Sequence, residues 1–223
     1  MIVRLAAGFL AAFAILASPV SAESYSIVGM DGTPVMNHVV PVETDDAIAR
    51  LPNVVSVGNP KGDVTIYEFY DLNCPYCRKA SADLRAMLAT DKRLNLVLVP
   101  FPVLGIPSIQ AGRVEFALAK MASPLKFYLF HQKVFSGRGV VDGERALAVA
   151  GELGFEREKL IAAANTEAVT EAMKAHVRFG DTLQAQATPS FVVRDVAIVG
   201  YPGRAGMEKI VKAVRACGKA QCR

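Results

Sequence analysis

The stretch that most constrains this chain is residues 64–77, Val-Thr-Ile-Tyr-Glu-Phe-Tyr-Asp-Leu-Asn-Cys-Pro-Tyr-Cys. Its first half is rich in β-branched and aromatic residues, which predicts a buried strand. Cys74 and Cys77 follow directly, and Ala80 and Leu84 then recur at helical spacing. The stretch therefore delivers two thiols to the first turn of a helix, where the helix dipole favours a thiolate. This arrangement predicts redox chemistry.

Further strands and helices are predicted downstream of this stretch. A second apolar run at residues 94–99 follows the helix and completes a parallel strand–helix–strand unit. The sequence pattern of residues 103–186 predicts four or five helices and no strand. Two strands at 190–194 and 196–200 and a last helix at 206–216 complete the order. This order predicts an α/β protein, a thioredoxin fold with a helical subdomain inserted between its βαβ and ββα halves.

The N-terminal part of the chain divides into two segments. Residues 1–22 contain Arg4, an apolar run and then Val20-Ser-Ala22, the pattern of a signal peptide cleaved after Ala22. We therefore expect an exported, periplasmic protein. Residues 23–62 are polar and are interrupted by Gly and Pro, so we expect an N-terminal extension that packs on the domain at 63–216, with a hairpin around Asp31-Gly32.

Export places the four cysteines in an oxidising environment. Proximity in the sequence pairs Cys74 with Cys77 and Cys217 with Cys222. The second pair lies in a tail at 217–223 and predicts a structural disulfide at the end of the last helix. A second redox pair that relays electrons to Cys74–Cys77 is the alternative.

The position of each thiol predicts its role. Cys74 lies at the start of the helix with Pro75 as the first helical residue, so we expect a lowered pKa and a nucleophile. Cys77 lies one turn further in, so we expect it to be buried, less acidic and to resolve the mixed disulfide. Glu68 shares a strand face with Ile66, and burial would raise its pKa and suit it to proton transfer.

These motifs resemble a known family. Cys74-Pro-Tyr-Cys77 follows Glu68-Phe-Tyr-Asp, and Thr188-Pro189-Ser-Phe and Phe101-Pro-Val-Leu-Gly105 lie downstream. Together they resemble the DsbA-like periplasmic thiol:disulfide oxidoreductases, in particular their ScsC- and Com1-like branch, over residues 54–216. The resemblance implies a cis bond before Pro189 and a proton-shuttling role for Glu68. It also implies no cofactor and a substrate surface formed by Thr188, Pro189, Pro75 and Tyr76.

Two details depart from the strongest oxidant of that family. No His lies between Cys74 and Cys77, and Thr188 precedes the proline. Both predict a moderate oxidant and leave oxidase, isomerase and reductase roles open. We expect the partners to be cysteine-containing exported proteins and a membrane redox partner that resets the Cys74–Cys77 pair. Residues 23–62 contain no long heptad run for an oligomerising stalk, so we expect a monomer.

Other classes of function are less well matched by the sequence. The net charge is +4 and the basic residues are spread along the chain, so we expect no nucleic-acid partner. The two cysteine pairs permit a zinc site, and a copper(I) ion held by Cys74 and Cys77 is chemically possible. A thioredoxin-fold carrier of copper or zinc is therefore the alternative function. His38, His131 and His176 are isolated in the sequence, and we expect them to be packed or surface residues.

Overall fold

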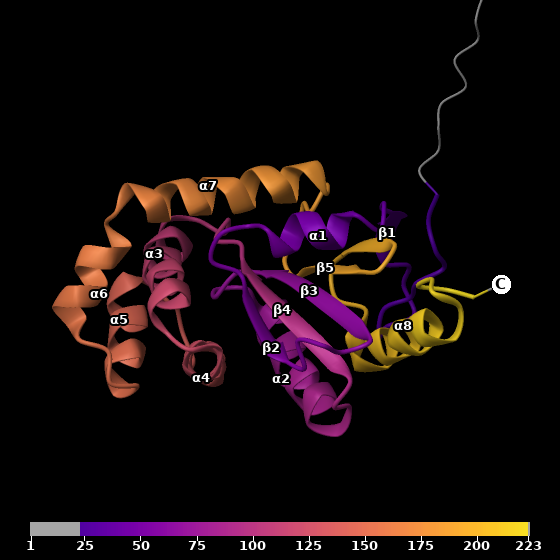
Figure 1. Cartoon of the computed structure of the whole chain (residues 1–223), viewed down its shortest axis with the longest axis horizontal. Helices are drawn as coiled ribbons and strands as arrows, with labels where there is room; N and C mark the ends of the chain where they lie inside the picture. The colour runs from indigo at the N-terminus through magenta and orange to yellow at the C-terminus, as the bar shows by residue number, and fades with distance from the viewer. Residues whose placement is uncertain (1–22, 223) are drawn as a thin grey trace, which may run out of the picture.

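A mixed sheet of six strands forms the centre of the computed structural model, which describes residues 23–222 (Figure 1). The predicted signal peptide lies outside the described residues. The strand order is β1-β6-β5-β3-β4-β2. β3 (Val64–Tyr70) and β4 (Leu94–Pro100) are parallel and are joined by α2 (Pro75–Thr90), whereas the other neighbours are antiparallel. The predicted thioredoxin fold is confirmed.

Both edges of the sheet come from the segment at residues 23–62. β1 (Met36–Val39) pairs with β6 (Val196–Val199), and β2 (Val55–Gly58) pairs with β4. α1 (Thr44–Ala49) connects the two edge strands. The chain pairs back on itself around the predicted turn, as the sequence suggests: Val28 and Pro34 form an antiparallel bridge, and the Val35 N–H donates to the Ile27 carbonyl oxygen at 2.9 Å. The segment is therefore an integral part of the sheet, built from strands too short and too exposed to give a strong pattern.

Five helices separate β4 from β5 (Ser190–Val193), as the sequence predicts. They extend to one side of the sheet, and the last of them runs back toward it along the top of the view in Figure 1. Side chains of Ser123, Asp142 and Thr166 cap three of these helices by accepting a backbone N–H bond. The helices are α3 (Ile106–Met121), α4 (Pro124–Ser136), α5 (Gly143–Glu152), α6 (Arg157–Ala164) and α7 (Glu167–Thr182).

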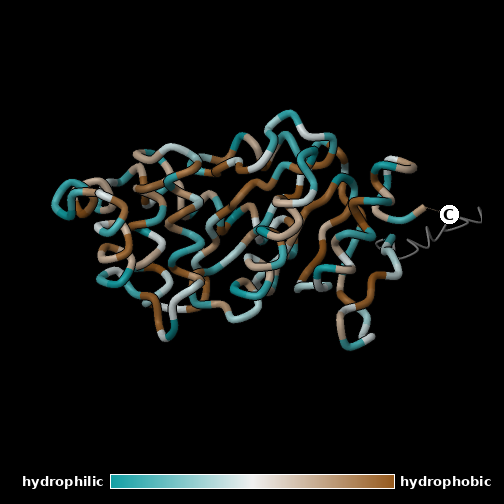
Figure 2. The backbone as a smooth tube through the Cα atoms, turned by 90° about the horizontal axis from the view of Figure 1, so that it is seen from below, coloured by the Kyte–Doolittle hydropathy of each residue, from teal (hydrophilic) through white to brown (hydrophobic). Residues whose placement is uncertain are grey.

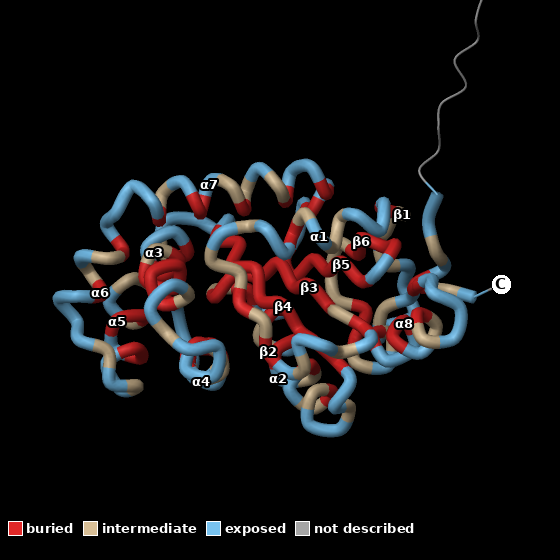
Figure 3. The backbone as a smooth tube through the Cα atoms, in the orientation of Figure 1, coloured by how far each residue is buried: buried red, intermediate tan, exposed pale blue. Residues whose placement is uncertain are grey.

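Apolar side chains cover both faces of the sheet. Nearly every residue of β3, β4 and β5 is buried (Figure 3), and hydrophobic stretches of the backbone run through the interior of the molecule in Figure 2. Ile66 and Tyr70 of β3 belong to the larger core, together with residues of α2 and of α8 (Gly203–Cys217). Phe69 belongs to the smaller core on the opposite face. Because strand residues alternate, Glu68 lies on the side of Ile66 and Tyr70.

None of the helices in residues 23–222 combines the length and the apolar character that crossing a bilayer requires.

Candidate active site

Cys74 occupies the N-cap of α2. Its backbone is extended (φ −80°, ψ 121°), Pro75 is the first helical residue, and the Cys77 N–H donates to the Cys74 sulfur at 3.4 Å. Proline is compatible with this position because the first helical N–H has no partner within the helix. The backbone N–H of Tyr76 also acts on this sulfur. The helix start therefore holds Cys74 where a negative charge is stabilised.

The environment of Cys74 favours its thiolate. A hydrogen bond from Cys77 is the largest effect that lowers the pKa of Cys74, to about 6. Burial opposes this shift, while the Thr188 side chain and the backbone N–H groups of Cys77 and Tyr76 add to it. The thiolate is the reactive form of cysteine, and a pKa of about 6 favours this form of Cys74 at neutral pH.

Cys77 has the opposite properties. It is fully buried, and burial raises its pKa well above the ordinary value, with further increases from the hydrogen bond to Cys74 and from the charges of Glu68 and Cys74. The Glu68 side chain is also fully buried, and burial raises its pKa to about 8, followed in size by the effect of the Cys74 charge. At neutral pH the Glu68 carboxyl therefore holds a proton within electrostatic range of the Cys77 thiol.

The loop before β5 lies against Cys74. The Thr188–Pro189 bond is cis, and the Thr188 carbonyl oxygen lies 3.1 Å from the Cys74 sulfur. The Pro189 carbonyl oxygen accepts from the Gly200 N–H at 3.0 Å, which ties the loop to the end of β6. The structure thus brings together Cys74, Cys77, Pro75, Thr188 and Pro189, with Glu68 within electrostatic range of both sulfurs.

Asp71 ties the thiol-bearing loop to the inserted helices, a role that the sequence did not reveal. Its Oδ2 accepts from the N–H groups of Val103 (2.9 Å) and Leu104 (3.0 Å), and its Oδ1 accepts from the Ser108 hydroxyl at 2.7 Å. Oδ1 also accepts from the Asn73 N–H at 2.8 Å. The Asp-Leu-Asn sequence before Cys74 is the available signal, because Asp favours such a turn.

Asn73 fixes a second loop beside Cys74. Its amide donates to the Val141 carbonyl oxygen at 2.8 Å and accepts from the Val141 N–H at 2.7 Å. The loop between α4 and α5 is thereby held next to the thiols. Apolar side chains are exposed on the neighbouring segments, with Tyr76 at 65%, and the others are Val103, Leu104, Ile106 and Val140. A partner segment with apolar side chains could pack on these exposed residues near Cys74.

A second buried carboxyl lies behind the site. The Tyr70 hydroxyl donates to Glu115 Oε1 at 2.6 Å, and burial raises the pKa of Glu115 to about 8. Glu115 lies on a helix among mostly apolar residues. The sequence alone does not distinguish it from a glutamate whose side chain is exposed. His131 is fully buried between the rings of Tyr70 and Phe135, which agrees with the expectation of a packed residue.

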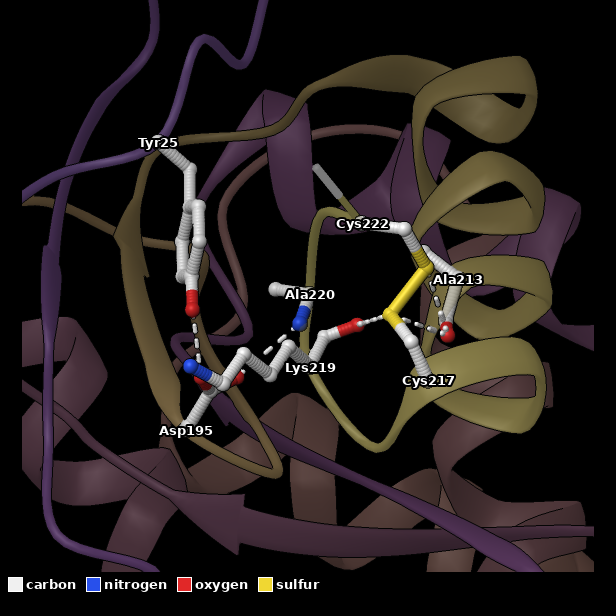
Figure 4. The surroundings of a disulfide bond; sticks show 7 residues. All are labelled: Tyr25, Asp195, Ala213, Cys217, Lys219, Ala220 and Cys222. Carbon is white, nitrogen blue, oxygen red and sulfur yellow. Dashed lines mark hydrogen bonds between the residues drawn. A yellow bond between two sulfur atoms is a disulfide. The ribbon is translucent and has the colours of Figure 1, made fainter.

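Cys217 and Cys222 form a disulfide at the end of α8 (S–S 2.07 Å; Figure 4). The tail that it closes places the Ala220 N–H 2.9 Å from Asp195 Oδ1, and the Tyr25 hydroxyl donates to the other oxygen of Asp195. The disulfide therefore stands beside contacts that join both ends of the described chain to the β5–β6 turn.

This disulfide lies far from Cys74. Arg215, two residues before Cys217, binds Asp63 at the start of β3, whereas Cys74 follows the other end of that strand. A strand of this length spans about 20 Å. The two pairs therefore cannot exchange electrons directly within one molecule, which argues against the relay alternative for Cys217–Cys222.

Residues 23–222 contain no group of three or more His, Cys, Asp and Glu side chains arranged to hold a metal ion. A metal carrier of the kind considered from the sequence would therefore have to use the Cys74 and Cys77 thiolates as its protein ligands.

Comparison with known proteins agrees with this geometry. A thioredoxin family model matches residues 51–213. The structure is similar to a thioredoxin-like oxidoreductase from Silicibacter pomeroyi DSS-3, with 31% identity, a TM-score of 0.71 and coverage of 77% of this chain and 98% of that one. It is also similar to α-DsbA2 from Wolbachia pipientis (20% identity, TM-score 0.69, 77% and 92% coverage). The catalytic domain of Proteus mirabilis ScsC gives 20% identity, a TM-score of 0.69 and coverage of 78% and 97%.

One curated relative is a much larger protein. The Na⁺/H⁺ antiporter NhaA of Herminiimonas arsenicoxydans is 25% identical over 168 residues, which are 74% of this chain and 26% of the antiporter. The chain thus spans about a quarter of that relative.

The fold, the helix-capping thiol pair and the family match lead to one conclusion: the chain belongs to the thioredoxin family, with the DsbA-like thiol:disulfide oxidoreductases as its structural neighbours.

Proposed function

We propose that this protein exchanges disulfides with cysteine-containing exported proteins in the periplasm, with Cys74 as the attacking thiol and Cys77 as the resolving thiol. The observation that carries this proposal is the asymmetry of the pair. The pKa of Cys74 falls to about 6 while that of Cys77 rises well above its ordinary value, although three positions separate them. A dithiol in a purely structural role has no need of this difference.

In the oxidising direction, a client thiolate attacks the Cys74 sulfur of the Cys74–Cys77 disulfide. The S–S bond breaks, Cys77 leaves as a thiolate, and it takes the proton that Glu68 holds. A second client thiolate then attacks the client sulfur of the mixed disulfide, and Cys74 leaves as a thiolate. The client gains a disulfide, and the pair gains the two electrons. A membrane redox partner that accepts these electrons would restore the disulfide.

The groups around Cys74 suit the binding of an extended client segment. The Thr188 carbonyl oxygen lies beside the sulfur, Pro189 follows in the cis form, and Tyr76 is exposed next to the helix start. A backbone N–H of the client could donate to the Thr188 carbonyl while its cysteine meets Cys74. We propose that Thr188, Pro189, Pro75 and Tyr76 form this surface and that the protein acts as a monomer.

Replacement of each thiol tests the proposal. We expect Cys74→Ser to abolish insulin reduction and dithiol oxidation, and Cys77→Ser to accumulate a mixed disulfide with a client peptide. Full activity of Cys74→Ser would overturn the proposal. The equilibrium of the wild-type pair with glutathione then fixes the direction of electron flow, because about 30 mV in reduction potential corresponds to about 1.4 kcal/mol.

The metal-carrier alternative is tested on the same protein. Purification under reducing conditions, followed by metal analysis and thiol titration, distinguishes the two functions. Stoichiometric copper or zinc that blocks titration of Cys74 and Cys77 would favour the carrier.

A further inference from the structure

Three side chains behind the thiols carry buried polar atoms that have no hydrogen-bond partner among residues 23–222. They are both carboxyl oxygens of Glu68, both ring nitrogens of His131 and the hydroxyl of Tyr128. Buried polar atoms are nearly always bonded to protein or to ordered water, because an unpaired one destabilises the fold. Asp45 Oδ1 is the other such atom in this range, and it belongs to α1 on the opposite face of the sheet.

The three side chains share one layer between β3 and α4. The His131 ring meets the Tyr70 ring edge-on with centroids 4.7 Å apart, and it stacks on the Tyr128 ring at 6.0 Å. Glu68 lies two residues before Tyr70 on the same face of β3. Burial raises the pKa of Tyr128 to about 12, and the charge of Glu68 adds to the shift, which places Tyr128 within electrostatic range of Glu68.

This layer leads from the buried carboxyl toward the surface. Glu68 and His131 are fully buried, whereas Tyr128 is partly exposed although its hydroxyl is buried, so Tyr128 is the outermost member of the layer. Burial lowers the pKa of His131 to about 3, so its ring is neutral at pH 7. A neutral imidazole carries one donor and one acceptor nitrogen, and a tyrosine hydroxyl both donates and accepts. Such groups can hold water molecules in a hydrogen-bonded row.

We propose that His131 and Tyr128 are positioning residues that hold ordered water between Glu68 and solvent, and that protons reach Glu68 along this route. The inference rests on the proposed function, in which Glu68 exchanges a proton with Cys77. When the Cys74–Cys77 bond is reduced, Glu68 gives its proton to the Cys77 thiolate and its carboxylate regains a proton from solvent through this water. On oxidation the proton travels the opposite way, and no electrons pass along the route.

The other ionisable groups near Glu68 offer a matched control. Cys74, Cys77, Tyr70 and Tyr201 lie within its electrostatic range, and Arg85 acts on Tyr128. Tyr201 is also a partly exposed tyrosine, but its hydroxyl already donates to Asp83 Oδ2 at 2.9 Å. Tyr201→Phe therefore removes a hydroxyl at a similar place without touching the unpaired layer.

The test follows the reduction of the oxidised protein by dithiothreitol from pH 5 to 9, in H₂O and in D₂O. We expect Tyr128→Phe to slow the reaction about tenfold, which is about 1.4 kcal/mol of activation free energy, and to enlarge the solvent isotope effect. The equilibrium constant with glutathione should stay unchanged, because the initial and final states keep the same protons. Tyr201→Phe should match the wild type in both measurements.

Three outcomes separate this inference from the proposed function. If Glu68→Gln leaves the pH profile unchanged, the proton role of Glu68 is wrong. If Glu68→Gln alters the profile but Tyr128→Phe behaves like Tyr201→Phe, the route alone is wrong. If Tyr128→Phe changes the glutathione equilibrium as much as the rate, Tyr128 acts on the stability of the pair and the route is again wrong. His131→Phe provides a second variant, and it should reproduce the effect of Tyr128→Phe.

Discussion

At the scale of single residues, the site depends on a carboxyl that the fold keeps away from water. Glu68 holds its proton in the folded protein up to a pKa of about 8, compared with an ordinary value of 4.5. Between these values the folded state binds more protons than the unfolded state, so the free energy of unfolding must fall as the pH rises. The folded protein therefore tolerates a destabilising group within electrostatic range of Cys77.

Glu68→Gln should remove this pH dependence. The amide cannot ionise, so the variant should gain stability relative to the wild type as the pH rises from 5 to 8. The gain at pH 7 should be about 3 kcal/mol, since each pKa unit corresponds to about 1.4 kcal/mol. Urea unfolding of the reduced proteins at several pH values measures it. Glu115 ionises in both proteins and cancels in the comparison, and parallel curves for wild type and variant would contradict the account.

At the scale of helices and strands, close packing of α7 on the end of β4 fixes the inserted helices. Gly180 of α7 is buried, and a Cβ there would lie 2.5 Å from Cε2 of the Phe101 ring. Phe101 directly follows β4 and its N–H donates to the Tyr70 carbonyl oxygen at 2.7 Å. α7 therefore packs against the start of the segment that follows β4. Asp71 binds the next residues of this segment, Val103 and Leu104, beside the thiols.

Two glycine-to-alanine variants should have opposite effects. Gly180→Ala should lower the free energy of unfolding by about 1–3 kcal/mol because its methyl group overpacks against Phe101. Gly151 in α5 has open space where a Cβ would lie, so Gly151→Ala should raise stability by about 0.5–1 kcal/mol. Thermal and urea unfolding of the two variants measure both changes. A stabilising Gly180→Ala would show that α7 can move away from Phe101.

The sequence was most informative where a pattern repeats. The alternation in β3, the N-cap cysteine and the long helical stretch at 103–186 were sufficient for the fold and for the thiol pair. Asp71, Glu115 and the unpaired layer around His131 were not predicted, because each acts through contacts with residues distant in the sequence. The residues of β1 were expected only as part of a hairpin, and their pairing with β6 was not predicted; β2 was not predicted because it has four residues and only two of them are buried.

At the scale of the whole molecule, the two ends of the described chain, residues 23–222, meet at Asp195. The Cys217–Cys222 disulfide closes the tail whose Ala220 N–H binds Asp195, and the Tyr25 hydroxyl binds the same carboxylate. Ser26 also donates its N–H to Gln221 Oε1 at 3.0 Å. These contacts support β1, the edge strand that pairs with β6.

Removal of the disulfide should affect stability and leave the redox site unchanged. We expect Cys217→Ala combined with Cys222→Ala to lower the free energy of unfolding by about 2 kcal/mol, the entropy contribution of a short closed loop. The glutathione equilibrium of Cys74–Cys77 should stay at its wild-type value because the two pairs lie at opposite ends of β3. Hydrogen exchange should increase first in β1. A changed equilibrium would reveal coupling between the pairs.

The meeting of Tyr25 and Ala220 at Asp195 has a consequence for the connectivity of the chain. A short peptide linker could join these two regions, and new termini could be opened at the exposed loop around Gly139, between α4 and α5. Such a circular permutant would keep every strand pairing of the sheet, including β1 with β6. The arrangement of the strands and helices in space therefore does not depend on their order along the chain. In the permutant, the segment before β3 would directly follow the segment after β6.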